Sequence, residues 1–200
     1  MRAFKPRTPD THCLRCLLRR EICICPILPS VSTRTEFLIL RHIGEGWRPS
    51  NTGRLIALAM PNSRIISWGG GTRVGLSPID DDLLRAPGTW LLWPDGPPDT
   101  QRDLMPPKRI VVLDATWRQA RRFYHRTPTL WSLPRFVLPS PTLSRNRLRD
   151  QHRADGMSTI EAVAAAVSMI EGTQAAEPLE KLYDEVVRRT NVLRWGDKSP

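Results

Sequence analysis

The sequence predicts an α/β fold in which a mostly parallel β-sheet is flanked by helices. Three observations support this class: short apolar runs of strand type recur along the chain, helical patterns separate them, and prolines collect in the connections. Apolar strands that alternate with helices are typical of parallel sheets covered on both faces. With 200 residues, 40% of them hydrophobic and 25% charged, the chain can bury a core of its own.

Four segments are expected to form the sheet. They are 36–42, 64–68, 89–93 and 109–113, and the last of them is the most apolar. A strong turn signal, Pro94-Asp95-Gly96-Pro97-Pro98, follows the third segment. Ligands bind parallel sheets at the carboxyl ends of their strands, so the loops after 89–93 and 109–113 are the predicted binding site.

Helices are expected in the intervals and after the last strand. The expected segments are 51–60, 78–86 and 117–125, followed by two longer ones. The first long helix starts at the capping box Ser158-x-x-Glu161 and stops at Gly172. The second has an apolar stripe from Leu179 to Leu193.

The net charge of +10 is concentrated in two segments. Residues 118–153 contain nine arginines and one acid (+8), and residues 1–25 contain six bases and two acids (+4), which leaves −2 for the remainder. This clustering indicates a polyanion partner, most simply a nucleic acid. A compositional bias toward arginine is the alternative, but it explains the choice of Arg over Lys and not the clustering.

Four cysteines lie within thirteen residues, in the order Cys13-x2-Cys16-x6-Cys23-x-Cys25. Four thiolates complete a tetrahedral zinc site, which would order a segment too small to fold alone. The alternatives are four unlinked thiols or two disulfides formed on isolation. The sequence starts without a secretory signal and has no apolar run near the ~20 residues of a membrane span, so we expect a cytoplasmic protein without membrane association.

An acidic residue follows the most apolar strand. Asp114 comes directly after the run 109–113, so its carboxylate is expected at the carboxyl edge of the sheet. There it can act as a general base, a metal ligand or a structural acceptor of loop amides. Trp117 can stack on a base or a cofactor ring, or cover the junction between helix and sheet.

The helix after Asp114 is basic. Arg118, Arg121 and Arg122 lie on adjoining faces, at i, i+3 and i+4, and such a row beside a strand-end site can bind phosphates. A solvated helix face is the alternative. Thr116 and Gln119 have the spacing of a capping box for this helix.

Together these segments resemble the DTW-domain family, in the family's order and over nearly the whole chain. The matching segments are the cysteine pattern, His42-x2-Glu45, Asn51-Thr-Gly-Arg54, Leu91-Leu-Trp-Pro94, Leu113-Asp-Ala-Thr-Trp-Arg-Gln-Ala-Arg121, Leu133-Pro-Arg135, Ser144-Arg145 and Ser158-Thr-Ile-Glu-Ala162. The resemblance implies a SPOUT-like fold with a knotted cofactor-binding region. It also implies two parts: a zinc-binding module, 1–32, and a catalytic domain, 33–200.

The resemblance implies a tRNA-uridine aminocarboxypropyltransferase. Such an enzyme moves the 3-amino-3-carboxypropyl group of S-adenosylmethionine to N3 of a uridine and releases methylthioadenosine. The expected partner is therefore tRNA, with zinc as the metal and with no obligate protein partner evident. The alternatives are an S-adenosylmethionine-dependent RNA methyltransferase and a non-catalytic zinc-bearing RNA-binding protein.

Site residues follow from the resemblance together with their positions. Asp114 is the expected base, or the group that orients the uracil edge. Ser158 and Thr159, at the amino end of a helix, are expected to receive the methionine carboxylate, and Glu161 to pair with its ammonium unless it only closes the capping box. The residues expected to hold adenosine are Trp93, Pro94, Asp95, Gly96, Leu113, Thr116 and Trp117. The residues expected to bind RNA are His42, Glu45, Arg118, Arg121, Arg122 and Arg145.

Overall fold

A five-stranded, all-parallel sheet forms the centre of the molecule. The structure is a computed structural model that describes residues 8–70, 76, 79–95, 106–139, 147–148 and 156–195. The strand order is β2-β1-β4-β3-β5, and every pairing is parallel. The strands are β1 Glu36–His42, β2 Ser63–Trp68, β3 Thr89–Leu92, β4 Arg109–Asp114 and β5 Arg135–Phe136.

All four predicted strands are present, with ends shifted by at most one residue. The fold class predicted from the sequence is therefore confirmed. Strand β5 was not predicted, because two residues are too short to show a period. It hydrogen-bonds with β3 at the edge of the sheet. The knot that the family resemblance implies stays a prediction.

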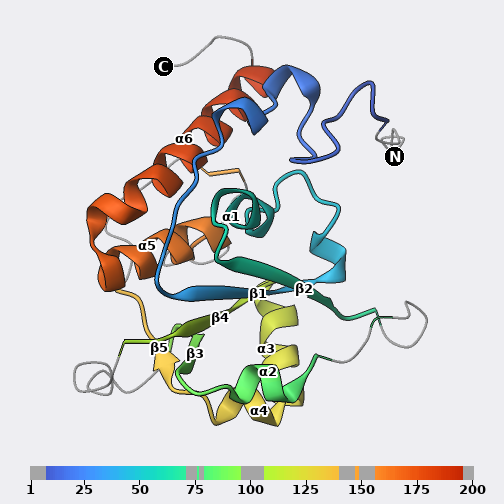
Figure 1. Ribbon diagram of the computed structural model, residues 1–200. Helices are drawn as coiled ribbons and strands as arrows, with labels where there is room; N and C mark the ends of the chain where they lie inside the picture. The colour runs from blue at the N-terminus through green and yellow to red at the C-terminus, as the bar shows by residue number, and fades with distance from the viewer. Residues whose placement is uncertain are drawn as a thin grey trace.

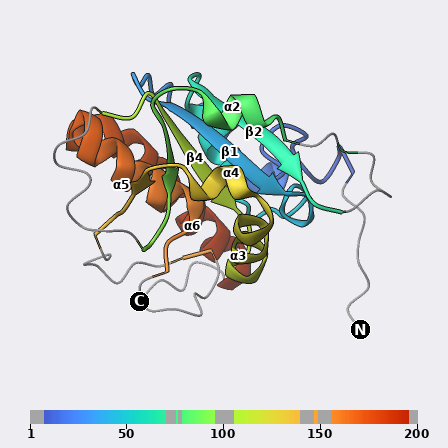
Figure 2. The same ribbon diagram turned by 90° about the horizontal axis from the view of Figure 1, so that it is seen from below.

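Helices cover both faces of the sheet. Figure 1 places α1, α5 and α6 on one face and α2, α3 and α4 on the other, and Figure 2 views the sheet from the second side. The alternation of side chains along a strand explains this arrangement, since Phe37 and Ile39 join the core under α5 and α6, whereas Leu38 and Leu40 join the core under the second layer. The helices are α1 Gly53–Ala59, α2 Asp81–Arg85, α3 Trp117–Arg126, α4 Pro128–Trp131, α5 Thr159–Glu171 and α6 Thr173–Trp195.

The helix ends follow the capping signals closely. Helices α3 and α5 both begin at complete capping boxes, at Thr116 and Ser158. Helix α5 ends at Gly172, whose φ of +96° suits glycine, and α6 begins at the next residue. Helix α2 is shorter than the predicted 78–86, and α6 starts six residues before Leu179, with Pro178 inside it. Among the described residues, no helix is both long enough and apolar enough to span a bilayer.

The cysteine-containing segment packs on the last helix. It carries the short 3-10 helices η1 Arg20–Ile22 and η2 Cys25–Ile27. Cys16, Leu18 and Ile24 belong to the same buried cluster as the inner face of α6. The guanidinium of Arg189 in α6 also donates a hydrogen bond to the carbonyl of Cys23. This segment therefore shares one core with the sheet, and a boundary at residue 32 stays a prediction.

Candidate functional site

Asp114 lies at the carboxyl edge of the sheet, as the last residue of β4. Its side chain follows Ile110 and Val112 on the face under α1 and α5, and it is 5% exposed. The parallel register places Arg41 of β1 beside it. The sequence-based expectation for the position of this carboxylate is thus confirmed.

Two side chains from separate segments, the loop before α1 and the first residue of α5, hold the Asp114 carboxylate. Asn51, just before α1, donates from Nδ2 to one oxygen at 2.6 Å, and Thr159, the first residue of α5, donates from Oγ1 to the other at 2.6 Å. The side-chain oxygen Oδ1 of Asn51 accepts the backbone N–H of Arg54, which fixes the orientation of the Asn51 amide group. The carboxylate thereby connects β4, α1 and α5.

A glycine allows this close approach. A Cβ atom added at Gly53 would overlap the carboxyl group of Asp114, so α1 can begin against β4 only with glycine at this position. Burial raises the pKa of Asp114, and the hydrogen bonds from Thr159 and Asn51 oppose part of that rise. A carboxyl group with a raised pKa is a stronger base than an exposed aspartate.

His42, at the end of β1, lies on the opposite face of the sheet edge. Its Nδ1 accepts the N–H of Gly44 at 3.0 Å and lies 3.1 Å from Nε2 of Gln119 in α3. Its ring meets Trp68 edge to face, with centroids 4.8 Å apart. Burial lowers the pKa of His42, although Glu45 opposes that shift. An accepting Nδ1 leaves the proton of the neutral ring on Nε2.

Glu45 is buried below the loop that follows β1. It lies in the 3-10 helix η3 Ile43–Glu45 and forms an ion pair with Arg48 at 3.3 Å. The guanidinium of Arg54, itself buried, donates to the carbonyls of Arg48 and Gly46. These contacts fix the loop between His42 and Asn51. Direct RNA binding by His42 and Glu45 stays a prediction.

Aromatic rings gather at the ends of β3 and β4. Trp93 stacks on Tyr124 of α3 with centroids 4.5 Å apart, and Trp117 meets Trp93 edge to face at 6.5 Å. Trp117 is 37% exposed, so part of this residue is open to solvent. Arg135 donates to the Asp95 carbonyl and to the Tyr124 hydroxyl, which ties the loop after β3 to α3. The structure thus brings Trp93, Pro94 and Asp95 close to Trp117.

The basic row on α3 is exposed as expected. Arg118, Arg121 and Arg122 all face solvent, directly after the strand that ends in Asp114. Over the described stretches of the chain, no ion pair joins any of the three to an acidic residue. Two of the sequence-based candidates, Gly96 and Arg145, lie outside the described residues.

The start of α5 is occupied by internal contacts. Ser158 and Glu161 bond reciprocally in the capping box, and Glu161 also pairs with Arg147 at 3.2 Å. The N–H of Ile160 donates to the Thr52 hydroxyl at 3.3 Å. These contacts match the capping alternative for Glu161, and an additional role toward a methionine ammonium stays a prediction.

The four cysteines converge. Their sulfur atoms all lie within 4.8 Å of one another, with 3.6 Å between Cys13 and Cys25 and 3.8 Å between Cys16 and Cys23. Tetrahedral coordination with Zn–S bonds of about 2.3 Å places sulfurs about 3.8 Å apart, so this geometry fits a bound ion. No disulfide joins the four cysteines, and the set can hold a metal.

Some residues of the site were not assigned from the sequence. Asn51 and Gly53 belong to the segment Asn51-Thr-Gly-Arg54, which the family resemblance includes but to which no function was given. Gln119 was assigned only to a capping box, yet its amide also reaches His42. The stacking of Tyr124 on Trp93 was not predicted, because it joins α3 to the end of β3 and no sequence spacing connects these two residues.

An all-parallel sheet with a buried carboxylate, aromatic rings and an arginine row at its carboxyl edge defines an α/β protein with a strand-end site. The DTW domain model matches residues 10–191, and the chain belongs to this family. No solved structure matches the chain.

Three relatives of this chain carry the name of an enzyme. The chain is 26% identical over 176 residues to tRNA-uridine aminocarboxypropyltransferase 2 of Macaca fascicularis, covering 84% of this chain and 59% of the relative. It is 27% identical to the protein of the same name from Mus musculus (82% and 57%), and 28% identical to that from Drosophila melanogaster (83% and 69%). The chain therefore spans well under the full length of these relatives.

Proposed function

We propose that this chain transfers the 3-amino-3-carboxypropyl group of S-adenosylmethionine to N3 of a uridine in tRNA. The observation that carries the proposal is the DTW match over residues 10–191, together with relatives named tRNA-uridine aminocarboxypropyltransferase. The buried Asp114 beside exposed arginines supports it, because the reaction needs both a base and a polyanion surface.

In the proposed reaction, uridine N3 loses its proton and attacks the aminocarboxypropyl carbon that is bonded to sulfur. An N–C bond forms and the C–S bond breaks. The sulfur keeps the electron pair, so neutral methylthioadenosine leaves. A sulfonium also activates its methyl group, and the orientation of the donor in the site therefore decides which carbon reacts. Asp114 either receives the N3 proton or orients the uracil edge, and burial raises its pKa in the direction that a base requires.

The donor would be held by the loops at the ends of β3 and β4. The aromatic faces of Trp93 and Trp117 suit an adenine ring, and Pro94, Asp95, Leu113 and Thr116 border them. The amino end of α5, at Ser158 and Thr159, suits the methionine carboxylate because a helix amino end favours negative charge. Glu161 is close enough to the same helix end to meet the ammonium.

RNA would be held outside the donor site at the ends of β3 and β4. Arg118, Arg121 and Arg122 would bind phosphates, with His42 and Glu45 shaping the loop between them and Asn51. The four-cysteine segment would bind zinc, whose role here is to order the fold and not to react. We place the reaction in the cytoplasm, where tRNA and reduced thiols are both available.

Two labelled forms of the donor test the reaction. The purified chain is incubated with unmodified tRNA and S-adenosylmethionine labelled either in the aminocarboxypropyl carbons or in the methyl group. The proposal expects the first label in RNA and the second in methylthioadenosine. Methyl label in RNA would instead identify a methyltransferase. Absence of both labels from RNA, with tRNA binding retained, would identify a binding protein without catalysis.

A further inference from the structure

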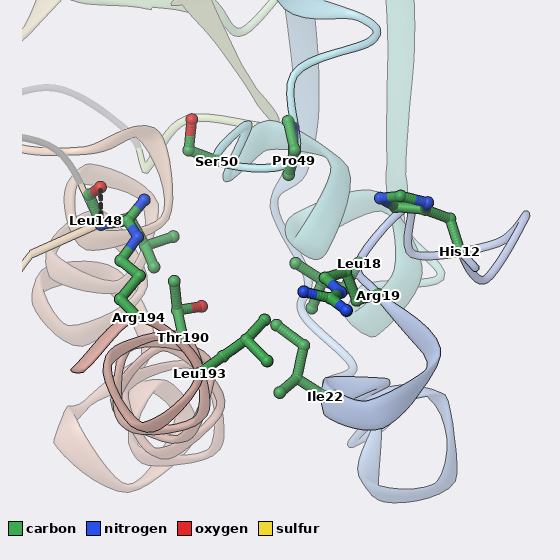
Figure 3. Close-up of a pocket in the computed structure, with 10 residues that line it drawn as sticks. All are labelled: His12, Leu18, Arg19, Ile22, Pro49, Ser50, Leu148, Thr190, Leu193 and Arg194. Atoms are coloured by element: carbon green, nitrogen blue, oxygen red, sulfur yellow. Dashed lines mark hydrogen bonds between the residues drawn. The ribbon is translucent and has the colours of Figure 1, made fainter. Parts of the chain in front are cut away.

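A pocket of about 270 Å³ lies between three segments of the chain and Leu148, which comes from a fourth (Figure 3). The cysteine-containing segment forms one wall, the last turns of α6 form the second, and the loop before α1 forms the third. Leu18, Ile22 and Leu193 give it apolar walls. His12 and Arg19, held side by side by a β-bridge, together with Arg194 make it basic.

The charged residues that line this pocket are all basic. None of the described residues that line it is acidic, although two arginines and a histidine are present. Arg19 forms an ion pair with the exposed Glu21 at 3.0 Å, whereas no ion pair joins Arg194 to an acidic residue in the described parts of the chain. Arg194 donates to the Leu148 carbonyl at 3.4 Å, which keeps its guanidinium at the pocket (Figure 3). An anion with an apolar, flat part fits these walls better than a simple inorganic ion.

The pocket borders the loops that hold the candidate active site. Ser50 lines the pocket, and the next residue, Asn51, donates to Asp114. Leu148 also lines it, and the preceding residue, Arg147, pairs with Glu161 at the start of α5. Neighbouring Cα atoms are about 3.8 Å apart, so the pocket and the Asp114 carboxylate share the loop that precedes α1.

An exposed aromatic ring lies on the same loop. Trp47, two residues before the lining residue Pro49, is 53% exposed, and the guanidinium of Arg48 lies 6.0 Å from its ring centre. Aromatic faces beside cationic side chains are the usual means of holding unpaired bases, because every base has a face that can stack.

We propose that this pocket binds one nucleotide of the tRNA strand next to the modified uridine. Its base lies between the apolar walls and its phosphate on Arg194. The inference rests on the proposed function, because it takes RNA as the substrate. It adds a second contact point, formed jointly by the cysteine-containing segment and the end of α6.

A variant that fills the pocket without changing its charge tests this proposal. Thr190 lines the pocket, and its hydroxyl donates a hydrogen bond to the Val186 carbonyl of its own helix. Thr190→Phe is expected to weaken tRNA binding at least about tenfold and to leave the affinity for S-adenosylmethionine unchanged. Val192→Phe, on the exposed side of the same helix, is the matched control and should bind tRNA as the wild type does.

A second pair of variants removes charge instead. Arg194→Gln should reduce the slope of log affinity for tRNA against log salt by about one, whereas Arg188→Gln, paired with Glu185 on the same helix, should not. If Thr190→Phe loses thermal stability, the comparison of Arg194→Gln with Arg188→Gln tests the proposal in its place.

Equal tRNA affinity and salt dependence in Thr190→Phe, Arg194→Gln and wild type would overturn the proposal while leaving the transferase function intact. Mononucleotide binding that tRNA does not displace would overturn it too, by showing a site for free nucleotides only. Failure of the wild-type chain to bind tRNA at all would overturn the proposed function and, with it, this inference.

Discussion

The Asp114 carboxylate is buried, and each of its two oxygens accepts a 2.6 Å hydrogen bond from a side chain of a different segment. Asp114→Asn keeps the shape of the side chain but removes the base and one of the two acceptors. We expect transfer to fall about 10²- to 10⁴-fold, with binding of S-adenosylmethionine retained, in a single-turnover assay with labelled donor.

Asp184→Asn, on the exposed face of α6, is the control for Asp114→Asn and should keep full activity. Retained transfer in Asp114→Asn would assign this carboxylate a structural role, as the acceptor that joins β4 to α1 and α5.

Replacing Gly53 with alanine should change the stability of the fold in the direction opposite to the usual one. Glycine to alanine within a helix ordinarily stabilises a protein by up to about 1 kcal/mol. At Gly53 the added methyl would overlap the Asp114 carboxylate, so Gly53→Ala should destabilise the fold by about 1–3 kcal/mol and abolish transfer. Urea unfolding and the transfer assay measure the two effects.

Gly172→Ala is the comparison for Gly53→Ala, because nothing lies near its Cβ but its φ is +96°. It should lose stability by about 1–2 kcal/mol and keep its activity. A stabilised or active Gly53→Ala would contradict the close approach of α1 to β4.

At the scale of elements, α6 holds the cysteine-containing segment through an ion cluster. Arg188 and Arg189 lower the pKa of Glu185 to about 2, and Arg189 also bonds the Cys23 carbonyl. A lowered pKa stabilises the fold fully above the ordinary value of 4.5, and this contribution is lost as the pH falls toward 2. Glu185→Gln should therefore lower Tm at pH 7, and the difference should shrink between pH 4.5 and pH 2.

Glu177→Gln on the same helix removes a more exposed ion pair, with Lys181, and should change Tm less. An equal loss in both variants, or a loss for Glu185→Gln that is constant across this pH range, would contradict the role of the Arg189 bridge. Calorimetry at several pH values makes the comparison.

Helix α3 presents its arginines without acidic partners in the described chain, so they should bind phosphates. Replacing Arg118, Arg121 and Arg122 with glutamine should weaken tRNA binding and reduce its salt slope by about two to three. Binding of S-adenosylmethionine should change little, with salt or with the substitutions. Arg85→Gln on α2, where the arginine already pairs with Asp81, is the control. An unchanged salt slope in the triple variant would exclude α3 from the RNA surface.

At the scale of the whole molecule, the cysteine-containing segment packs against α6, which is far from it in the sequence. Because Cys16 is buried in the same cluster as α6, removing the metal should affect more than a local loop. Chelation, or Cys16→Ser, should release about one zinc per chain, lower Tm and weaken tRNA binding. Mass spectrometry of the native protein counts the metal. A chain that carries no metal, or whose Tm ignores chelation, would contradict the zinc assignment.

The sequence predicted those parts of the fold that depend on local chemistry. The four longer strands, both capping boxes and the stop at Gly172 all have signals within a few residues. Strand β5 and helix α4 have none, because two and four residues are too few for a period. They form where β3 and α3 provide a partner.

The site was predictable in position but not in its contacts. The apolar run before Asp114 placed the carboxylate at the sheet edge. That Asn51 and Thr159 hold it depends on residues 63 and 45 positions away in the chain, and no spacing rule connects such distances. The pocket lined by Ser50 is built from four segments that meet only in the folded chain, so the sequence offered no signal for it.

The docking of the cysteine-containing segment on α6 sets an order of events during synthesis. The thiols precede α6 in the chain, so they leave the ribosome before the helix that covers Cys16 and bonds the Cys23 carbonyl is made. Until then four thiols remain open to oxidation beside a sheet that is already assembling. Early capture of a metal would protect these thiols and hold the segment in the shape that α6 later binds.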